Sequence, residues 1–460
     1  MDLFRTKAIG TDVHAETGLL RTLGAGDLVL LGIGAIIGAG VFVLTGVAAA
    51  TQAGPALVLS FVLAGLACVF AGLCYAELAA AVGGCGSAYG YAYAALGEIV
   101  AWVIGWALVL EYGMAVSAVA VGWSGYFNNA LAAVGLELPS ALTAAPAAGG
   151  IVNLPAMAII LLLGFLLSLG VRNSARFNAA IVFIKLAAIG IFVVIAAGNV
   201  DPANWKPFLP FGWQGVVSGA ALIFFAYIGF DAVSTAAEET KQPQRDMPIG
   251  IIGSLAVCTL IYMLVAGLLT GIAPYHTLNT PSPVSEALLS LGYRWGSAVV
   301  AAGAIAGLTS VMLVMYYGLS RVLFAMSRDA LLPERFATLH PRTRTPVFVI
   351  ALVGVVASLA AGFTPIGAIA QLVNIGTLFA FVIVCLGVLV LRRTRPDLHR
   401  PFRVPFSPVF PILGVATCLY LMLNLDVATW QYFLIWMVLG LVIYGGYSVR
   451  HSRQPRSSET

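Results

Sequence analysis

Two stretches of the sequence place glycine where a long apolar helix should be continuous. The first runs from Gly32 to Phe42, reads GIGAIIGAGVF and holds four glycines within nine residues, each costing about 1 kcal/mol of helix propensity relative to alanine. The second runs from Phe224 to Asp231, reads FFAYIGFD and follows its glycine with a carboxylate. Close helix packing would also explain the first stretch. Two such stretches at matching positions of two halves favour helices that are interrupted inside a membrane.

Interrupted helices can bind a ligand with backbone groups alone. The N-terminus of a half-helix presents N–H donors and a positive dipole end, which suit a carboxylate, whereas free carbonyl groups and helix C-termini suit an ammonium. A zwitterion satisfies both at once. The pattern therefore predicts an α-amino acid or a similar small molecule as the ligand.

A single lysine, Lys185, stands deep inside an apolar stretch, in the sequence FIKL. It has no carboxylate near it in the sequence, and burial away from water disfavours the charged ammonium. Lys185 is therefore predicted to gain and lose a proton during a transport cycle, because charged groups at membrane depth are functional candidates. The alternative is a fixed cation that stays paired with a carboxylate or a helix C-terminus.

The carboxylates at or near membrane depth have predicted roles that are mostly structural. Glu111 could gate proton access, bind a polar group near the site or make a structural hydrogen bond to a neighbouring helix. Glu77 and Glu98 lie close to helix ends, where pairing with solvent or an arginine is expected. Asp231 is expected to cap the second half of its interrupted helix.

Three larger side chains could shape the site. Phe225 and Tyr227 adjoin the second glycine interruption and could close the site as a gate, although aromatic residues in membrane helices also serve as plain packing. Met315 could supply an apolar wall through its flexible thioether, and core packing is the alternative for a lone methionine.

The elements that must position these residues are membrane helices. The chain has 460 residues, of which 60% are hydrophobic and 9% charged, against about 45–50% and about 25% in ordinary soluble chains. Since a span needs roughly 20 apolar residues, the predicted fold class is an all-α integral membrane protein with twelve transmembrane helices. They are predicted at residues 27–51, 56–82, 97–124, 154–171, 176–198, 213–237, 248–273, 296–327, 346–362, 367–391, 405–425 and 427–449.

The distribution of basic residues predicts how these helices are oriented. Cytoplasmic loops carry an excess of lysine and arginine. Twenty of these residues fall on the side of both termini, while only Lys206 and Arg294 fall on the other side. Both termini are therefore predicted to be cytoplasmic. The first 26 residues are polar and carry charges of both signs, which does not match a cleaved signal peptide.

Several function classes are not expected. All five histidines fall in predicted loops or tails, which argues against a membrane cytochrome, and no Gly-Lys-Ser or Gly-Lys-Thr loop for ATP occurs. The basic residues form short runs, so no nucleic-acid partner is expected. The cysteines show no paired spacing, so no metal site, disulfide or cofactor is predicted. They are interpreted as small core residues, at Cys68, Cys74, Cys85, Cys258, Cys385 and Cys418.

Five stretches together resemble the amino acid, polyamine and organocation superfamily of secondary transporters, and most of all a prokaryotic member of its cationic amino acid transporter family. They read GIGAIIGAGVFVLTG from Gly32, YAELAAAVGGCGSAYGYAYAALGEIVAWVIGWALVLEY from Tyr75, RNSARFNAAIVFIKL from Arg172, FFAYIGFDAVSTAAEETKQPQRDMPIGI from Phe224 and SRVLFAMSRDALLP from Ser320. The resemblance implies amino acid transport by alternating access and not catalysis. It also implies a five-plus-five inverted repeat with discontinuous first and sixth helices. The segments are a cytoplasmic N-terminal segment 1–26, repeats 27–198 and 199–391, two extra helices in 392–449 and a cytoplasmic tail 450–460.

The resemblance further implies where the substrate binds. In similar proteins the substrate carboxylate meets backbone amides at the first break, and its amine meets carbonyl groups at the second. Proton-coupled relatives carry a lysine in the fifth helix where sodium-coupled ones hold an ion, and Lys185 matches that position. A proton is therefore the expected coupling ion, and no sodium site is expected. The substrate residues mapped in this way are Ile36, Ala39 and Gly40 at the first break and Phe225, Ala226 and Ile228 at the second.

The mapped wall of Ile36, Phe225 and Met315 offers no acceptor for a second positive charge. The expected substrates are therefore small neutral L-amino acids such as alanine, imported by proton symport, unless Glu111 reaches the pocket. An amino acid exchanger and a carrier of arginine or lysine are the alternatives on the same fold. A receptor and a channel are rival classes, and no row of charges that would line a pore is present. The bacterial inner membrane is the expected location, with membrane lipids around the protein and an accessory subunit left open.

Overall fold

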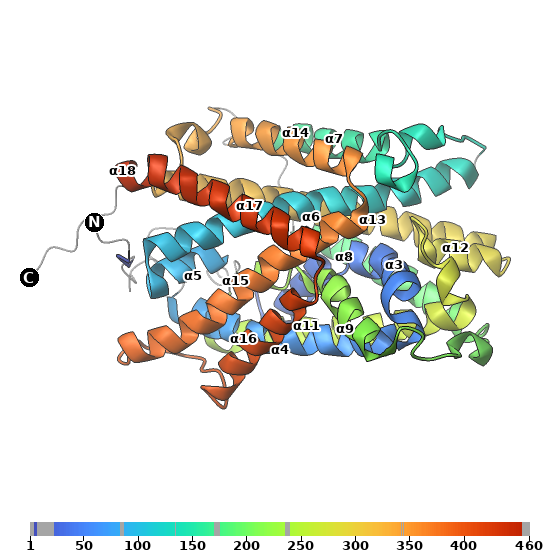
Figure 1. Ribbon diagram of the computed structural model, residues 1–460, viewed down its shortest axis with the longest axis horizontal. Coiled ribbons are helices and arrows are strands. Elements are labelled where there is room, and N and C mark those ends of the chain that lie inside the picture. The colour runs from blue at the N-terminus through green and yellow to red at the C-terminus, as the bar shows by residue number, and fades with distance from the viewer. Residues whose placement is uncertain are drawn as a thin grey trace, which may run out of the picture.

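The computed structural model describes residues 4–6, 23–82, 87–133, 135–169, 175–234, 240–341, 343 and 345–452. Over these residues the chain is helical and contains no strand, and Figure 1 shows its helices as one elongated bundle. Seven helices in the described part are long and apolar enough to cross a membrane, and five shorter apolar helices of 10–17 residues accompany them. The protein is therefore an all-helical, multi-pass membrane protein.

Each of the twelve predicted ranges overlaps one of these helices. The longer ones are α4 (Leu57–Val82), α6 (Glu98–Ala133), α8 (Ala175–Ala197), α11 (Pro243–Ile272), α13 (Arg294–Arg328), α15 (Ile366–Thr394) and α17 (Val427–Ile443), which continues through η11 (Tyr444–Ser448) and α18 (Val449–His451). The shorter ones are α2 (Ala25–Ile36), α7 (Leu154–Ser168), α9 (Gly212–Ile223), α14 (Val347–Phe363) and α16 (Val409–Leu423).

Some boundaries differ from the predicted ones. Helix α6 continues to Ala133 instead of ending at 124, and α11 begins at Pro243 instead of 248. A proline in the first turn is tolerated because the N–H it lacks has no intrahelical partner there. The short helices α5 (Ser87–Leu96) and α12 (Pro283–Ser290) lie in segments predicted as loops, since both are too short to stand out as spans.

Two apolar helices are interrupted at the predicted glycines. Helix α2 ends at Ile36, the next residue is extended with φ −72° and ψ 106°, and the chain turns helical again in η1 (Gly40–Leu44), which leads into α3 (Thr45–Ala48). Helix α9 ends at Ile223 and is followed by a tight turn, η7 (Phe224–Tyr227). Ile228 is extended, and α10 (Asp231–Ser234) starts beyond it.

The other helices enclose these interruptions. Helix α6 packs against α13 and α15, while α11 packs against α2 and α4. In Figure 1, α7 and α14 run side by side along one edge of the bundle, away from the interrupted helices. The interruptions are therefore shielded from the outer surface by α6, α11, α13 and α15.

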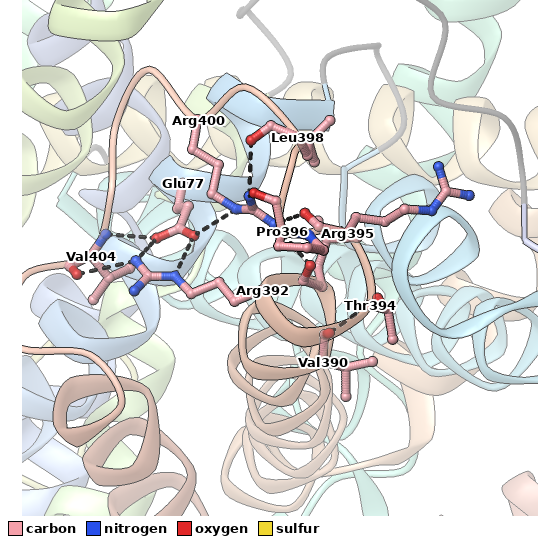
Figure 2. A network of polar contacts seen from close by, with 10 residues as sticks. Glu77, Val390, Arg392, Thr394, Arg395, Pro396, Leu398, Arg400 and Val404 are labelled. Atoms are coloured by element: carbon pink, nitrogen blue, oxygen red, sulfur yellow. Dashed lines mark hydrogen bonds and ion pairs between the residues drawn. The ribbon is translucent and has the colours of Figure 1, made fainter.

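A buried ion network fastens α4 to α15. Arg392 donates to the two carboxylate oxygens of Glu77 at 2.8 and 2.5 Å, and the backbone N–H of Val404 donates to Oε2 at 2.6 Å (Figure 2). Arg400 lies 3.7 Å from the same carboxylate and also donates to the carbonyl oxygen of Leu391, in the last turn of α15, at 2.8 Å. The structural pairing predicted for Glu77 is thus confirmed.

A second carboxylate joins the two ends of the chain. Glu98, at the start of α6, accepts hydrogen bonds from Arg5 Nε at 2.7 Å, Ser452 Oγ at 2.6 Å, Tyr93 at 2.8 Å and Tyr444 at 3.0 Å. A carboxylate in the first turn of a helix also interacts favourably with the helix dipole. The structural pairing expected for Glu98 is present, and residues 5 and 452 lie at the same end of the bundle.

Candidate substrate site

The two interruptions lie against each other because glycine stands at the contact. A β-carbon added at Gly40 would lie 2.3 Å from the Cα of Ala226, which leaves no room for a side chain. Gly229 has a φ of +114°, and a β-carbon there would lie 2.7 Å from the carbonyl oxygen of Ala35. Side chains rarely adopt that backbone conformation. The glycines that interrupt the helices are thus also what allows the two breaks to meet.

Both breaks line a small cavity together with α6 and α13. Its volume is about 10 Å³, which is room for about one water molecule. A ligand of the size of an amino acid therefore fits only after the site widens. The cavity is lined by the predicted residues Ile36, Ala39, Gly40, Phe225, Ile228 and Met315, and also by Ala35, Gly38, Ala115, Val119 and Val311.

Six of the seven residues predicted to contact substrate therefore line one cavity, and the seventh, Ala226, lies against Gly40. The prediction missed Ala115 and Val119 of α6 and Val311 of α13. Val311 lies one helical turn before Met315, so helical spacing could have found it. Ala115 and Val119 are also one turn apart, but nothing in their chemistry singles them out from the rest of an apolar helix.

The backbone at the breaks offers both kinds of polar group. The first N–H groups after a helix start lack intrahelical partners, and Ala39 and Gly40 bring such groups to the cavity. At the second break, the carbonyl oxygen of Phe225 accepts the N–H of Ile228 at 3.2 Å, and that of Ala226 accepts a tyrosine hydroxyl at 2.8 Å. Each of these two carbonyl groups already has one donor, and its second lone pair is left for a donor on a ligand.

The tyrosine is Tyr262 of α11, which the sequence analysis did not identify. Its hydroxyl lies 3.0 Å from the carbonyl oxygen of Ile36 and 2.8 Å from that of Ala226. A hydroxyl carries only one hydrogen to donate, so two carbonyl groups, one from each break, share a single donor. Tyr262 stands in an apolar run of α11, where one tyrosine gives no signal of such a role.

Lys185 is fully buried and faces the first break, although it does not line the cavity. Its ammonium donates to the carbonyl oxygens of Gly34 at 2.6 Å and Ile37 at 2.9 Å, at the negative end of the α2 dipole. Within the described ranges no carboxylate lies within 4.0 Å of it. The geometry identifies the helix C-terminus as its partner in this conformation, and whether the proton leaves during transport stays a prediction.

Glu111, Asp231 and Tyr227 lie near the breaks but do not line the cavity. Asp231 begins α10 and accepts a hydrogen bond from Tyr112 of α6 at 2.8 Å. Glu111 is buried, and its Cβ lies 3.7 Å from where a β-carbon at Gly376 of α15 would stand. Tyr227 donates to the carbonyl oxygen of a residue of α4 at 2.8 Å, so its hydroxyl points away from the cavity. The gating roles suggested for Glu111 and Tyr227 stay predictions.

The five cysteines that the structure describes lie in the core and form no disulfide. Cys68, Cys74, Cys258, Cys385 and Cys418 are buried and unpaired in disulfides, while Cys85 lies outside the described residues. No cluster of three or more histidine, cysteine or acidic residues that could hold a metal occurs in the described part of the chain.

A helical membrane bundle in which two interrupted helices meet at one cavity has the architecture of a secondary transporter. A family model described as amino acid permease matches residues 23–444, and the chain belongs to that family. It is similar to the methylthioribose transporter and to the branched-chain amino acid permease BcaP of Bacillus subtilis (strain 168), at 50% identity in both cases over 98% of each chain. It is 30% identical to human cationic amino acid transporter 4 over 96% of this chain and 89% of that one. The predicted superfamily and its transport activity are thus confirmed, and the protein is not an enzyme.

Proposed function

We propose that this permease imports small neutral L-amino acids, such as alanine, by proton-coupled symport with alternating access. One observation carries the proposal: the buried ammonium of Lys185 is held at 2.6 and 2.9 Å by carbonyl groups of the first break. Those carbonyl groups lie at the C-terminal end of α2, which lines the cavity. Removing the proton from Lys185 takes away the charge that strengthens both hydrogen bonds, which loosens the break and couples protonation to the shape of the site.

The proposed pose uses the backbone groups of both breaks. The substrate carboxylate meets the N–H groups at Ala39 and Gly40, and its amine takes over the carbonyl groups at Phe225, Ala226 and Ile228. The lysine ammonium occupies two carbonyl oxygens at the first break that a sodium ion would otherwise use as ligands. A proton, and not sodium, is therefore the proposed coupling ion.

The fold supports this cycle through a proposed five-plus-five repeat. Helices α2 to α8 form the first repeat and α9 to α15 the second, with α16 and α17 added. Because residues 5 and 452 meet at Glu98, an even number of crossings is favoured. Both termini are proposed to face the cytoplasm, since twenty basic residues lie on that side, and the bacterial inner membrane is the proposed location.

The substrate side chain is proposed to lie against an apolar wall. Ile36, Phe225, Val311 and Met315 offer no partner for a charged side chain, which favours neutral amino acids over arginine or lysine. Because one similar protein is named a branched-chain amino acid permease, leucine, isoleucine and valine are the second candidates. The similar methylthioribose transporter makes that sugar a useful third compound in competition assays.

Uptake into sodium-free proteoliposomes tests the proposal. Labelled alanine is added outside at acidic pH, with empty vesicles, a protonophore control and the competitors above. The expected result is accumulation that the protonophore abolishes and that Lys185→Ala loses, while Lys206→Ala, which changes an exposed lysine, keeps it.

Two other results would overturn parts of the proposal. Entry only into vesicles preloaded with amino acid, without dependence on pH, identifies an exchanger and leaves Lys185 as a structural cation. No uptake of labelled alanine, together with uptake of labelled valine or methylthioribose under the same conditions, corrects the substrate.

A further inference from the structure

A second buried side chain holds the carbonyl end of the second broken helix. Asn374 of α15 is fully buried, and its amide nitrogen donates to the carbonyl oxygens of Ala221 at 2.7 Å and Leu222 at 2.9 Å. Both carbonyl groups belong to the last turn of α9, where the regular backbone donors of the next turn are missing, and that of Leu222 also accepts the N–H of Phe224. Reversing the amide would set its oxygen against two carbonyl oxygens, so the nitrogen must face them.

This arrangement repeats the one at the first break. In the proposed repeats, α8 is the fifth helix of the first half and α15 the fifth helix of the second. Each sends one buried side chain to the carbonyl end of the broken helix that opens its own half: Lys185 to α2 and Asn374 to α9. Each makes two hydrogen bonds there. The difference is chemical, because an ammonium can lose a proton and a carboxamide cannot.

We propose that Asn374 is a positioning residue that fixes the end of α9, the counterpart of Lys185, and that its neutral amide confines proton coupling to the first break. This inference rests on the proposed function for its transport consequence. A second observation supports it: among the described residues the amide oxygen of Asn374 has no hydrogen-bond partner. A buried acceptor without a donor is costly, so the amide is retained for its two N–H donors. One titratable cap then predicts one coupled proton for each substrate.

The groups around the two caps set the expected behaviour of variants. Glu111 of α6 lies beside Gly376, two residues beyond Asn374. A carboxyl introduced at position 374 would therefore meet acidic or neutral groups, which favour the protonated form of that carboxyl. On the side of Asn374 the titratable groups are Glu111, Tyr112, Asp231 and Tyr75 of α4, whose ring contacts Phe381 of α15. The titratable group beside Lys185 is Cys258.

Asn374→Asp tests the inference because it keeps the size of the side chain and makes the cap titratable. At acidic pH the protonated carboxyl still donates one of the two hydrogen bonds, so the Michaelis constant for alanine exchange should stay closer to the wild type than at alkaline pH. At alkaline pH, once this buried carboxyl has lost its proton, a carboxylate would face two carbonyl oxygens, and the constant should rise at least about tenfold. Asn374→Leu, which donates nothing, should raise it by a similar factor at every pH. Asn199→Asp is the control, because Asn199 caps the end of α8 away from the breaks.

Thermal unfolding of the detergent-purified protein provides a readout that needs no transport. The unfolding midpoint of Asn374→Asp should lie close to that of the wild type at acidic pH and fall further below it toward alkaline pH, whereas that of Asn199→Asp should change much less. Identical midpoints and identical exchange profiles for Asn374→Asp and the wild type would overturn the inference. If the wild type carries no alanine but the midpoints behave as expected, the proposed substrate is wrong and the cap at Asn374 stands.

Discussion

Replacing Gly40 with alanine tests whether contact between the two breaks forms the substrate site. The added β-carbon would lie 2.3 Å from both the Cα and the Cβ of Ala226, whereas ordinary contacts begin at 3.4 Å. The two breaks must therefore separate by about 1.1 Å. Since one of the opposing atoms belongs to the backbone, no side-chain rotation relieves the clash.

The expected size of the effect follows from this displacement. Overpacking of this kind costs about 1–3 kcal/mol, which corresponds to about a 5–150-fold change in an equilibrium constant. In the proposed pose the carboxylate and amine subsites lie on opposite sides of the contact, so the penalty falls on a substrate that must touch both. The Michaelis constant for alanine exchange should rise within this range.

The assay is exchange of labelled alanine in proteoliposomes over a range of concentrations, with thermal unfolding of the same preparations. Gly113→Ala is the matched control, because a β-carbon there lies 3.6 Å from its nearest neighbour in a continuous helix, where alanine is favoured by about 1 kcal/mol. If Gly40→Ala exchanges alanine as well as Gly113→Ala does, the two breaks do not bind one substrate between them, and the site must be sought elsewhere.

Three further substitutions test separate parts of the structure. Met315→Ala widens one wall of the cavity, so the preference for leucine over alanine, measured by competition for uptake, should rise by about tenfold or more. Unchanged selectivity would place Met315 outside the side-chain pocket. Tyr262→Phe leaves the carbonyl groups of Ile36 and Ala226 without their shared donor, so the unfolding midpoint should fall without substrate and recover more strongly than the wild type when alanine is added. Glu77→Gln leaves two arginines facing a neutral group, a change that costs about 3–5 kcal/mol for a buried pair; its unfolding midpoint should drop well below that of Glu137→Gln, which alters an exposed carboxylate.

The interruptions and the buried lysine were predictable because each breaks a local rule. Four glycines within nine residues of an apolar stretch oppose helix formation, and a lysine far from either end of a span has no water to reach. Such violations are visible in the sequence without any knowledge of neighbouring helices. Five of the six substrate residues that the resemblance implied line one cavity, and Met315, chosen for its side-chain chemistry, lines it too.

The side chains that hold the breaks in place were not predictable in the same way. Tyr262 and Asn374 are ordinary polar residues within apolar helices, and each acts on carbonyl groups more than 30 residues away in the chain. Likewise Arg392 was counted only as one of many basic residues, and its pairing with Glu77 spans 315 positions. Separation along the chain carries no information about which helices become neighbours.

The sequence by itself therefore determined that this is a membrane protein of apolar helices with two glycine-rich interruptions and one buried cation, because burial in lipid and helix propensity act residue by residue. Only the tertiary structure decided that the interruptions touch at Gly40, that Lys185 donates hydrogen bonds to carbonyl groups at the end of α2, and that Asn374 donates hydrogen bonds to carbonyl groups at the end of α9. Hydrogen bonds to free carbonyl groups depend on distances of about 3 Å between separate helices, and those distances exist only after the helices have packed.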